Sequence, residues 1–260
     1  MSDYAINLDD VREAANRIAP FIRRTPLMTS ASVDRATGRE TYLKCENLQR
    51  VGAFKYRGAT NAVQKRDDET AARGVVTPSS GNHAQALALA AQIRGLDCHV
   101  VMPPNAPAVK RDAVRDFGAT IYECAPTQEA RERSAAEVCA ATGGLLIPPF
   151  DHPDILAGQG TCGLEIHEDQ PDLDAVIVPV GGGGLLSGIT LALRELSPRT
   201  RIIAAEPAGA DDAFRGKRDG VRVTEQVPDT IADGLRTCVG ELTWPVLVDC
   251  VDRVITVTDD

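Results

Sequence analysis

The sequence of 260 residues lacks features that would place it in a specialised class of protein. No apolar run approaches the ~20 residues that a membrane-spanning helix needs. The start, MSDYAINLDD, has no basic end followed by an apolar stretch, so no export signal is visible. No Cys-x-x-Cys pair occurs, and the cysteines are scattered over positions 45, 98, 124, 139, 162, 238 and 250. This pattern argues against structural zinc and a disulfide framework, and it predicts a cytoplasmic protein with reduced thiols.

Positive charge is also scarce. There are 28 Lys and Arg residues against 37 Asp and Glu residues, which gives a formal net charge of −9. This balance argues against general binding to nucleic acid or to an anionic membrane surface. Hydrophobic residues make up 43% of the chain and charged residues 25%, which are ordinary values for a globular protein. The length allows one large domain or two modest ones, each with its own core.

Strand-like and helix-like segments alternate, a pattern that predicts an α/β fold with parallel strands. Helices are expected at about 9–18, 84–94, 106–117, 127–141 and 185–196, and residues 163–168 are expected to lie within another. Strands are expected at 41–44, 99–102, 120–124, 175–180, 201–205 and 254–257. The compact block from Pro78 to Thr142 is interpreted as a small domain inserted into a larger one.

The strongest local signal is the run of four glycines Gly181, Gly182, Gly183 and Gly184, between the strand DAVIVPV and the helix LLSGITLALREL. Glycines let backbone N–H groups turn inward without obstruction from a Cβ atom, and the following helix contributes its positive end. Together these features predict an anion site, with phosphate as the favoured ligand. The competing interpretation is a plain flexible turn, for which two glycines would suffice.

Two common nucleotide-binding motifs do not account for the glycines of this sequence. No Gly-Lys-Ser/Thr follows the glycine run, which excludes a Walker-type site. Residues 158–163 do match G-x-G-x-x-G, but the preceding HPDILA makes a poor strand. The next strand ends in Val180, without the acidic residue that a dinucleotide site expects. We therefore interpret the match as close packing at the start of a helix.

A second polar cluster, Ser79-Ser80-Gly81-Asn82-His83, stands just before the alanine-rich helix. Hydroxyl and amide groups at a helix start offer hydrogen-bond donors to a carboxylate or a phosphate. An ordinary helix cap is the simpler interpretation, although five polar or glycine residues in a row exceed what capping needs.

The third signal is Lys55, which follows Phe54 in the segment GAFKYRG. Alone, such a lysine is most simply a solvated surface residue. Flanked by an aromatic ring and glycines, it is a candidate for a partly desolvated amine, which has a lowered pKa and attacks carbonyl groups. A reactive lysine together with a phosphate loop suggests a phosphorylated carbonyl cofactor, a description that pyridoxal phosphate fits.

These three motifs, which occur along the chain in the order Lys55, residues 79–83 and the glycine run, resemble the fold-type II pyridoxal-phosphate enzymes. The resemblance is to the branch of serine/threonine dehydratases and serine racemases. The resemblance also takes in TPLMTSASVD, YLKCENLQRVGAFKYRGA, ILAGQGT, AAEPAGADD and TIADGL, and so covers essentially the whole chain. It implies a tryptophan synthase β-like fold with two open parallel-sheet domains. The large cofactor-binding domain would comprise residues 1–68 and 152–260, and the small inserted domain residues 74–148. The family usually forms homodimers.

The resemblance also implies a role for each motif. Lys55 would bind the cofactor as a Schiff base and later take the substrate Cα proton. Phe54 would pack beside the cofactor, and Asn82 would hydrogen-bond its ring hydroxyl. The remaining cofactor contacts would come from the phosphate-binding run 181–184 and from Gly234, near the ring. The substrate carboxylate would be surrounded by Ser79, Ser80, Gly81 and His83. Arg131 matches an arginine that reaches the carboxylate, and its alternative role is a charge on a helix surface.

Two features are similar to the racemase-like subgroup. Ser80 stands where many threonine dehydratases of the branch carry alanine, and the matching serine in serine racemases is the acid/base opposite the lysine. Its simpler role would be carboxylate binding alone. In the same subgroup, residues matching Glu206, the Ala210 carbonyl and Asp212 bind a divalent cation, and oxygen ligands suit Mg²⁺ or Ca²⁺. Without the resemblance, these acidic residues would be interpreted as a solvated loop.

The resemblance implies an ammonia-lyase that converts small β-hydroxy amino acids, serine or threonine, to a 2-oxo acid and ammonia. The alternatives are serine racemisation, 3-hydroxyaspartate dehydration and, more remotely, a shortened homologue without catalysis. The family continues for several dozen residues beyond the position of Asp260, and that region supplies a hydroxyl group for the pyridine nitrogen. A chain that ends here is therefore expected to lack part of the large domain.

Overall fold

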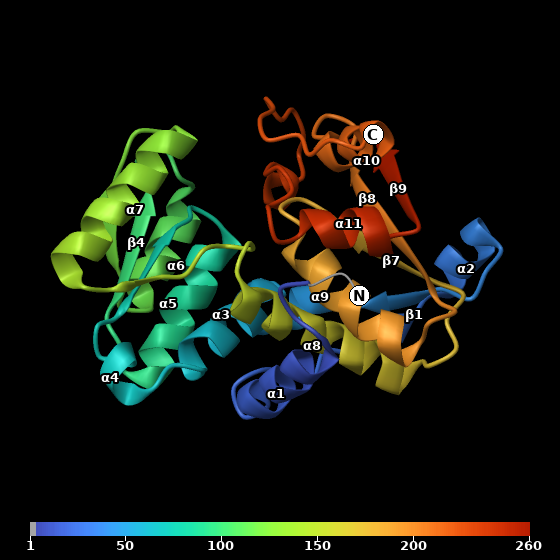
Figure 1. The fold of residues 1–260 in the computed structure, drawn as a ribbon, viewed down its shortest axis with the longest axis horizontal. Coiled ribbons are helices and arrows are strands. Elements are labelled where there is room, and N and C mark those ends of the chain that lie inside the picture. The colour runs from blue at the N-terminus through green and yellow to red at the C-terminus, as the bar shows by residue number, and fades with distance from the viewer. Residues whose placement is uncertain (1–3) are drawn as a thin grey trace.

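The computed structural model describes residues 4–260. The chain forms two lobes, each built around a parallel sheet, and long helices run along the base of the molecule from one lobe to the other (Figure 1). In the part of the chain that is described, no helix is both long and apolar enough to cross a membrane.

The smaller lobe contains a four-stranded parallel sheet in the order β5-β4-β3-β6. Its strands are β3 (Val75–Pro78), β4 (Cys98–Met102), β5 (Thr120–Glu123) and β6 (Leu145–Leu146). They are connected by helices α5 (Asn82–Arg94), α6 (Ala108–Asp116) and α7 (Gln128–Thr142). The alanines of α5 are almost all buried, since a short side chain lets the helix approach both the sheet and the helix on its other side.

The larger lobe contains the parallel sheet β7-β8-β9, formed by β7 (Ala175–Pro179), β8 (Arg201–Pro207) and β9 (Arg253–Val257). Helix α9 (Gly184–Leu196) joins β7 to β8. Helix α10 (Asp212–Asp219), the 3-10 turn η3 (Asp233–Leu235) and helix α11 (Trp244–Cys250) lie between β8 and β9. Apolar residues of the sheet, such as Val178 and Ile202, share one core with Leu186 of α9 and Leu247 of α11.

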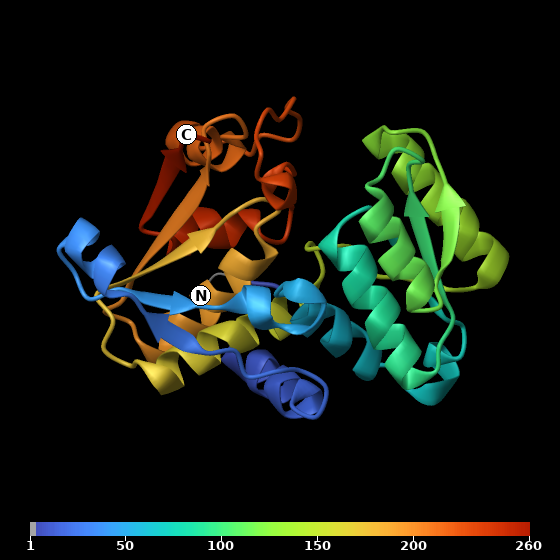
Figure 2. The same cartoon turned by 180° about the vertical axis from the view of Figure 1, so that it is seen from behind.

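The amino-terminal part supplies the base and one side of the molecule. It comprises α1 (Leu8–Ile18), β1 (Leu27–Thr29), α2 (Ala31–Thr37), β2 (Tyr42–Lys44), the 3-10 turns η1 (Glu46–Leu48) and η2 (Arg50–Gly52), α3 (Lys55–Gln64) and α4 (Asp68–Ala71). Strands β1 and β2 pair antiparallel, and Figure 2 shows them in blue on the larger lobe. The long helix α8 (Pro153–Asp169) follows the smaller lobe in sequence and packs against α1, α3 and α9.

Glycines bring α3, α8 and α9 into close contact. A Cβ atom on Gly158 would lie 2.6 Å from the Cα atom of Gly58, and one on Gly188 would lie 2.5 Å from the backbone nitrogen of Gly160. The G-x-G-x-x-G match is therefore packing glycine, as predicted. It lies in the middle of α8 and not at a helix start, because the poor strand HPDILA is itself the first part of this helix.

A buried ion network anchors the start of α3. The side chain of Arg57 is fully buried and donates hydrogen bonds of 2.6–2.9 Å to Glu46 of η1 and Glu165 of α8. Lys44 forms a second ion pair with Glu165 at 2.6 Å. Since an unpaired buried charge is costly, this network holds the first turn of α3 against α8.

The predicted helices and strands are all present, with ends that differ by a few residues. Thr127 caps α7 as expected, because its hydroxyl accepts a hydrogen bond from the Ala130 N–H group. The sequence pattern does not predict the short elements β1, β3, β6, α2 and α4, nor helices α10 and α11. All of these contain only two to eight residues, too few for a hydrophobic period to stand out.

Candidate active site

Lys55 lies in the first turn of α3, between the two lobes. Its Nζ atom donates a 2.7 Å hydrogen bond to the carbonyl oxygen of Pro149, and it lies 5.2 Å from the ring centre of Phe54 and 6.0 Å from that of Phe150. Burial lowers the pKa of this amine from 10.5 to about 8. The prediction of a desolvated amine, in preference to a solvated surface lysine, agrees with this environment.

The glycine run forms the tight connection between β7 and α9. A Cβ atom on Gly182 would lie 2.4 Å from the ring of Phe150, and Gly183 adopts a φ of +86°, which favours glycine. Phe150 therefore contacts both the glycine run and the surroundings of Lys55. Because only a backbone without side chains fits here, the run is a narrow cradle and not merely a flexible turn.

Gly234, predicted to lie near the cofactor ring, is close to the same run. A Cβ atom on Gly181 would lie 3.3 Å from the Gly234 carbonyl oxygen and 3.1 Å from the Cα atom of Leu235. The turn η3 and the glycine run thus lie side by side, although about 50 residues separate them in sequence.

The segment Ser79–His83 joins β3 to α5, as the motif predicted. Ser79 accepts a 3.4 Å hydrogen bond from the Gly81 N–H group, and Ser80, Gly81 and Asn82 lie at the start of α5. His83 is buried, and its Nε2 atom lies 3.1 Å from the Ile147 carbonyl oxygen. Burial and, next, the charge of Lys55 lower the pKa of His83 to about 3, so the ring is neutral at pH 7.

This hydrogen bond also fixes which nitrogen of His83 carries the proton. Since a carbonyl oxygen only accepts, Nε2 must be the donor, and Nδ1 is left with a lone pair. Nδ1 is buried without a hydrogen-bond partner. In this form the imidazole offers an acceptor and no free donor, so a substrate carboxylate would be bound by other groups of the segment.

Arg131 lies in the first turn of α7, at the carboxyl end of the small sheet. Its side chain is half-buried, its Nε atom has no hydrogen-bond partner, and its charge acts on the thiol of Cys124, just after β5. The carboxyl ends of parallel strands share one edge of a sheet, so Arg131 and Ser79–His83 lie on the same edge. This arrangement is compatible with the predicted carboxylate contact.

The predicted cation ligands lie at the end of β8 and the start of α10. The Glu206 carboxylate accepts hydrogen bonds from the N–H groups of Ala213 (3.2 Å) and Phe214 (2.6 Å), and Asp212 accepts from Gln226 and from Val239 N–H, both at 2.8 Å. Burial, followed by the nearby aspartates, raises the pKa of Glu206 to about 8. Burial likewise raises the pKa of Asp212. Carboxylate and carbonyl oxygens, the atom types that Glu206, Asp212 and Ala210 offer, are the ligands that a hard divalent cation takes.

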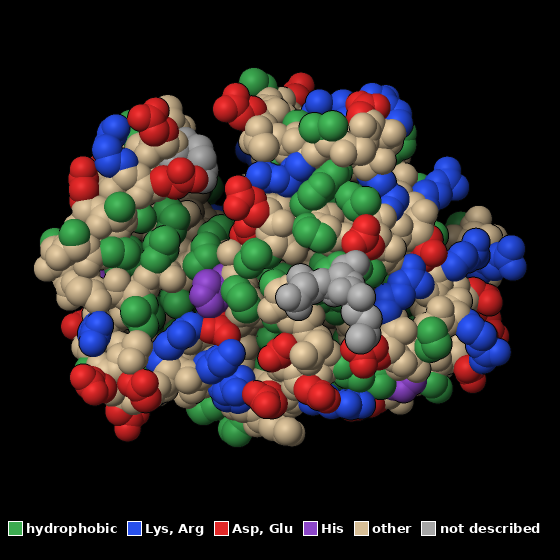
Figure 3. Space-filling model, in the orientation of Figure 1, with side chains coloured by type: hydrophobic (Ala, Val, Ile, Leu, Met, Phe, Trp, Pro, Cys, Tyr) green, Lys and Arg blue, Asp and Glu red, His purple; other side chains and the backbone are tan. Residues whose placement is uncertain are grey.

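The residues present also fit pyridoxal phosphate. The amine of Lys55 is desolvated, Cβ atoms on Gly182 and Gly183 would clash with Phe150 and Thr243, and a helix begins at the cradle. These are the groups that an aldehyde and a phosphate ester require at opposite ends of one ligand. Figure 3 shows the surface hollowed between the two lobes.

Sequence reasoning missed Pro149 and Phe150, which connect Lys55 to the glycine run. No local motif marks them, because the hydrogen bond from Lys55 to Pro149 spans 94 positions in the chain.

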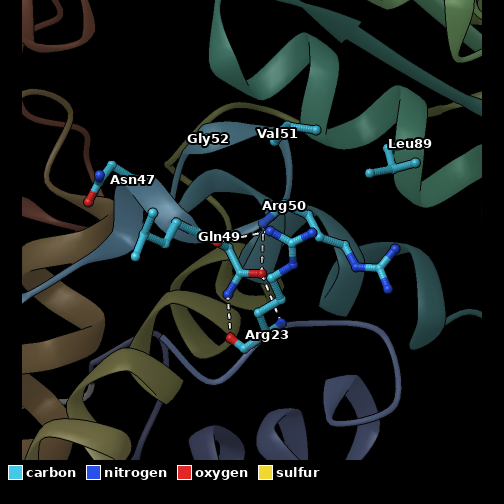
Figure 4. Close-up of a pocket in the computed structure, with 8 residues that line it drawn as sticks. Arg23, Asn47, Gln49, Arg50, Val51, Gly52 and Leu89 are labelled. Atoms are coloured by element: carbon cyan, nitrogen blue, oxygen red, sulfur yellow. Dashed lines mark hydrogen bonds between the residues drawn. The ribbon is translucent and has the colours of Figure 1, made fainter. Parts of the chain in front are cut away.

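A separate pocket of about 440 Å³ lies beside η1 and η2 (Figure 4). Its lining includes Arg23, Arg50 and Leu89, and it also contains Val51, whose φ of 56° is unusual for a branched residue. The Gln49 side chain holds its wall together, since it accepts from the N–H groups of Arg23 and Arg50 and donates to the Arg23 carbonyl. Lys55 does not line this pocket.

Comparisons with known proteins agree with this geometry. Residues 18–260 match the family model described as pyridoxal-phosphate dependent enzyme. Serine racemase from Arabidopsis thaliana is 49% identical over 98% of this chain and 77% of its own length, and β-hydroxyaspartate dehydratase from Paracoccus denitrificans is 48% identical over 98% and 81%. The solved structure of maize serine racemase matches with a TM-score of 0.97 and 48% identity, over 98% of this chain and 78% of the maize chain.

Proposed function

Because the chain belongs to the family of pyridoxal-phosphate dependent enzymes, we propose that it removes the Cα proton of small β-hydroxy amino acids, racemising serine and dehydrating 3-hydroxyaspartate. The observation that carries this proposal is the desolvated amine of Lys55, which is hydrogen-bonded to Pro149, next to the Phe150 ring that packs on the glycine cradle. The fold class, an α/β structure with parallel sheets of the fold-type II kind, agrees with the sequence prediction.

When bound, pyridoxal phosphate supplies an aldehyde for the amine and a ring that withdraws electrons from Cα. The chain supplies the remaining parts of the reaction. Lys55 would hold the aldehyde of the cofactor in the resting enzyme, and its amine, when free, would take the proton from the substrate Cα. A pKa near 8 suits this base, because roughly a tenth to a fifth of the amine is neutral close to physiological pH. The Pro149 carbonyl holds the free amine between the two aromatic rings.

The product depends on what happens after Cα has lost its proton. We propose that the hydroxyl of Ser80 lies on the side of Cα opposite Lys55. Returning a proton to Cα from that face would invert the configuration and racemise serine. If the β-hydroxyl leaves as water instead, hydrolysis of the resulting enamine gives a 2-oxo acid and ammonia. Arg131 and the donors at the start of α5 would hold the α-carboxylate in both reactions.

The sequence alone favoured dehydration of serine and threonine over these alternatives. The relatives shift that preference, since similar proteins from Arabidopsis and Paracoccus are named serine racemase and β-hydroxyaspartate dehydratase. Threonine is therefore a less favoured substrate in our proposal. We also propose that Glu206, the Ala210 carbonyl and Asp212 bind Mg²⁺ or Ca²⁺, that the protein is a homodimer, and that it works in the cytoplasm.

Replacing the amine of Lys55 tests the proposal directly. Lys55→Ala should abolish the visible absorbance of the imine with pyridoxal phosphate and reduce turnover of serine and of 3-hydroxyaspartate by at least about 10³-fold, because nucleophile and base are lost together. Full activity in this variant would refute the mechanism. Wild-type protein that stays colourless with added pyridoxal phosphate would favour a homologue without catalysis.

Ser80→Ala separates the two reactions. The change should reduce the rate of D-serine formation by about 10²-fold or more, which is the usual contribution of a general acid or base. The loss of water from 3-hydroxyaspartate should continue. Chiral chromatography and 2-oxo acid assays on the same samples give both rates. Equal loss of the two activities would show that Ser80 only binds the carboxylate, and a wild type that makes no D-serine would end the racemase proposal.

A further inference from the structure

Thr243 sits immediately before α11 and has an unusual hydrogen bond for that position. A threonine before a helix commonly accepts a hydrogen bond from the helix's own N–H groups. Here the side chain makes no such bond, and its Oγ1 atom instead donates a 2.8 Å hydrogen bond to the Gly182 carbonyl, 61 positions earlier. Thr243 is fully buried. The hydroxyl therefore serves the glycine run and not the helix that it precedes.

A second donor reinforces this contact. The N–H group of Gly240 lies 3.2 Å from the same Gly182 carbonyl oxygen. The carbonyl is thus held toward residues 240–243 by two donors. In a trans peptide the C=O and N–H groups point in opposite directions, so the N–H group of Gly183 is turned away from residues 240–243. Gly183 has the positive φ that this arrangement needs, with Thr243 packed against the place of its missing Cβ.

Asp151 fixes residues 240–243 in turn. Its two carboxylate oxygens accept hydrogen bonds from the N–H groups of Glu241 (2.8 Å) and Leu242 (2.9 Å). A Cβ atom on Gly240 would lie 2.3 Å from the Asp151 carboxylate, so glycine permits this approach. Asp151 follows Phe150, the residue that contacts the glycine cradle. Two carboxylate–amide bonds, each stronger than a neutral hydrogen bond, make this support rigid.

We propose that Thr243 is a positioning residue for the phosphate cradle: by holding the Gly182 carbonyl outward, it presents the Gly183 N–H group to the phosphate ester of the cofactor. Asp151 supports Thr243 by fixing the segment on which it lies. This inference rests on the proposed function, because it assumes that the glycine run binds the phosphate of pyridoxal phosphate. It assigns a role to a residue that touches neither the aldehyde nor the substrate.

Comparing pyridoxal phosphate with pyridoxal, which lacks the phosphate, tests the role of Thr243. The full chain is first freed of aldehyde, and each ligand is titrated while the visible absorbance of its imine is followed. Wild-type protein should bind pyridoxal phosphate at least about tenfold more tightly than pyridoxal. In Thr243→Val this preference should fall by about five- to tenfold, because one oriented donor is lost, while binding of pyridoxal is unchanged. Free pyridoxal also forms an internal hemiacetal, which lowers its apparent affinity. This effect is the same for every variant, so it cancels when the preferences of two variants are compared.

Three further variants separate positioning from general damage. Thr190 of α9 has another fully buried hydroxyl, and this hydroxyl has no hydrogen-bond partner. Thr190→Val should therefore leave the preference for pyridoxal phosphate unchanged. Thr243→Ser restores the hydroxyl and should restore the preference. Asp151→Asn, which offers one acceptor where two are needed, should lower the preference even if Thr243→Val does not fold.

The outcomes distinguish this inference from the proposed function. A wild-type protein with no preference for the phosphate ester would show that the glycine run does not bind it, and both proposals would fail. A wild type with the preference, together with Thr243→Val and Asp151→Asn variants that keep it in full, would overturn the role of Thr243 alone. Equal weakening of both ligands in Thr243→Val would likewise contradict a phosphate-specific role.

Discussion

Lys55 illustrates how a single residue obtains its chemistry from its neighbours. The amine is enclosed by the rings of Phe54 and Phe150 and has the Pro149 carbonyl as a hydrogen-bond acceptor. Rings and a carbonyl stabilise a cation far less than water does, so burial lowers the pKa to about 8. The neutral, nucleophilic form is therefore present at a pH where an exposed lysine is almost wholly protonated.

This shift predicts the pH dependence of labelling at Lys55. The full chain freed of aldehyde is treated briefly with acetic anhydride at several pH values, and the acetylated fraction at Lys55 is measured by mass spectrometry. Because only the neutral amine reacts, labelling should rise with pH and reach its midpoint near pH 8. Exposed lysines in the same digest should have midpoints about two units higher. A midpoint near 10.5 at Lys55 would show that the amine is solvated.

At the scale of elements, the contact between α8 and α9 determines where the glycine cradle lies. Helix α9 begins at the cradle, and its Gly188 meets Gly160 and the Leu156 carbonyl of α8. Without Cβ atoms the two backbones approach closely, and α3 packs on the same stretch of α8 through Gly58 and Gly158. Lys55 and the cradle thus lie on two helices that share one support.

Gly188→Ala should therefore be destabilising, although alanine favours helix by about 1 kcal/mol over glycine. The added Cβ atom would lie 2.5 Å from two backbone atoms, which forces the helices apart. We expect the free energy of unfolding, measured by urea denaturation, to fall by about 1–3 kcal/mol. Gly163→Ala, where the nearest atom is 3.2 Å away, is the matched control and should cost less. Equal effects would contradict close packing as the cause.

At the scale of the whole molecule, an ion pair connects the two lobes across the site. Lys110 of α6, in the smaller lobe, bonds to Asp233 of η3, in the larger lobe, beside Gly234. The hydrogen bond with Lys110 is the main cause that lowers the pKa of Asp233. The pair is partly exposed, so it adds little to stability, but it favours the arrangement in which the lobes approach one another.

Lys110→Gln should weaken this approach and raise KM for serine by roughly two- to fivefold, the equivalent of up to about 1 kcal/mol, with kcat little changed. The melting temperature should stay close to that of the wild type. Arg115→Gln removes another ion pair, with Asp112, on the same helix but within one lobe, and should leave KM unaltered. The proposed role of the Lys110–Asp233 pair would be abandoned if both variants changed KM to the same extent. It would also be abandoned if Lys110→Gln left KM unchanged at low salt.

Local sequence patterns by themselves determined most of the secondary structure of this protein and its family. The alternation of helices and strands, the cap at Thr127 and the glycine run before α9 follow from periodicity and from the conformational freedom of glycine, which are properties of neighbouring residues. The motif order also indicated the family, which the comparisons confirmed. The choice among substrates did not follow in the same way, since the same motifs serve racemases and lyases.

Tertiary structure alone decided the environment of the reactive amine. Pro149 lies 94 positions from Lys55, and Thr243 lies 61 positions from Gly182, and no local pattern marks either partner. The neutral state of His83 and the raised pKa of Glu206 likewise arise from burial by distant segments. Residue types and their spacing specify which groups are available, whereas desolvation and orientation depend on what the folded chain packs around them, because both act through space and not along the sequence.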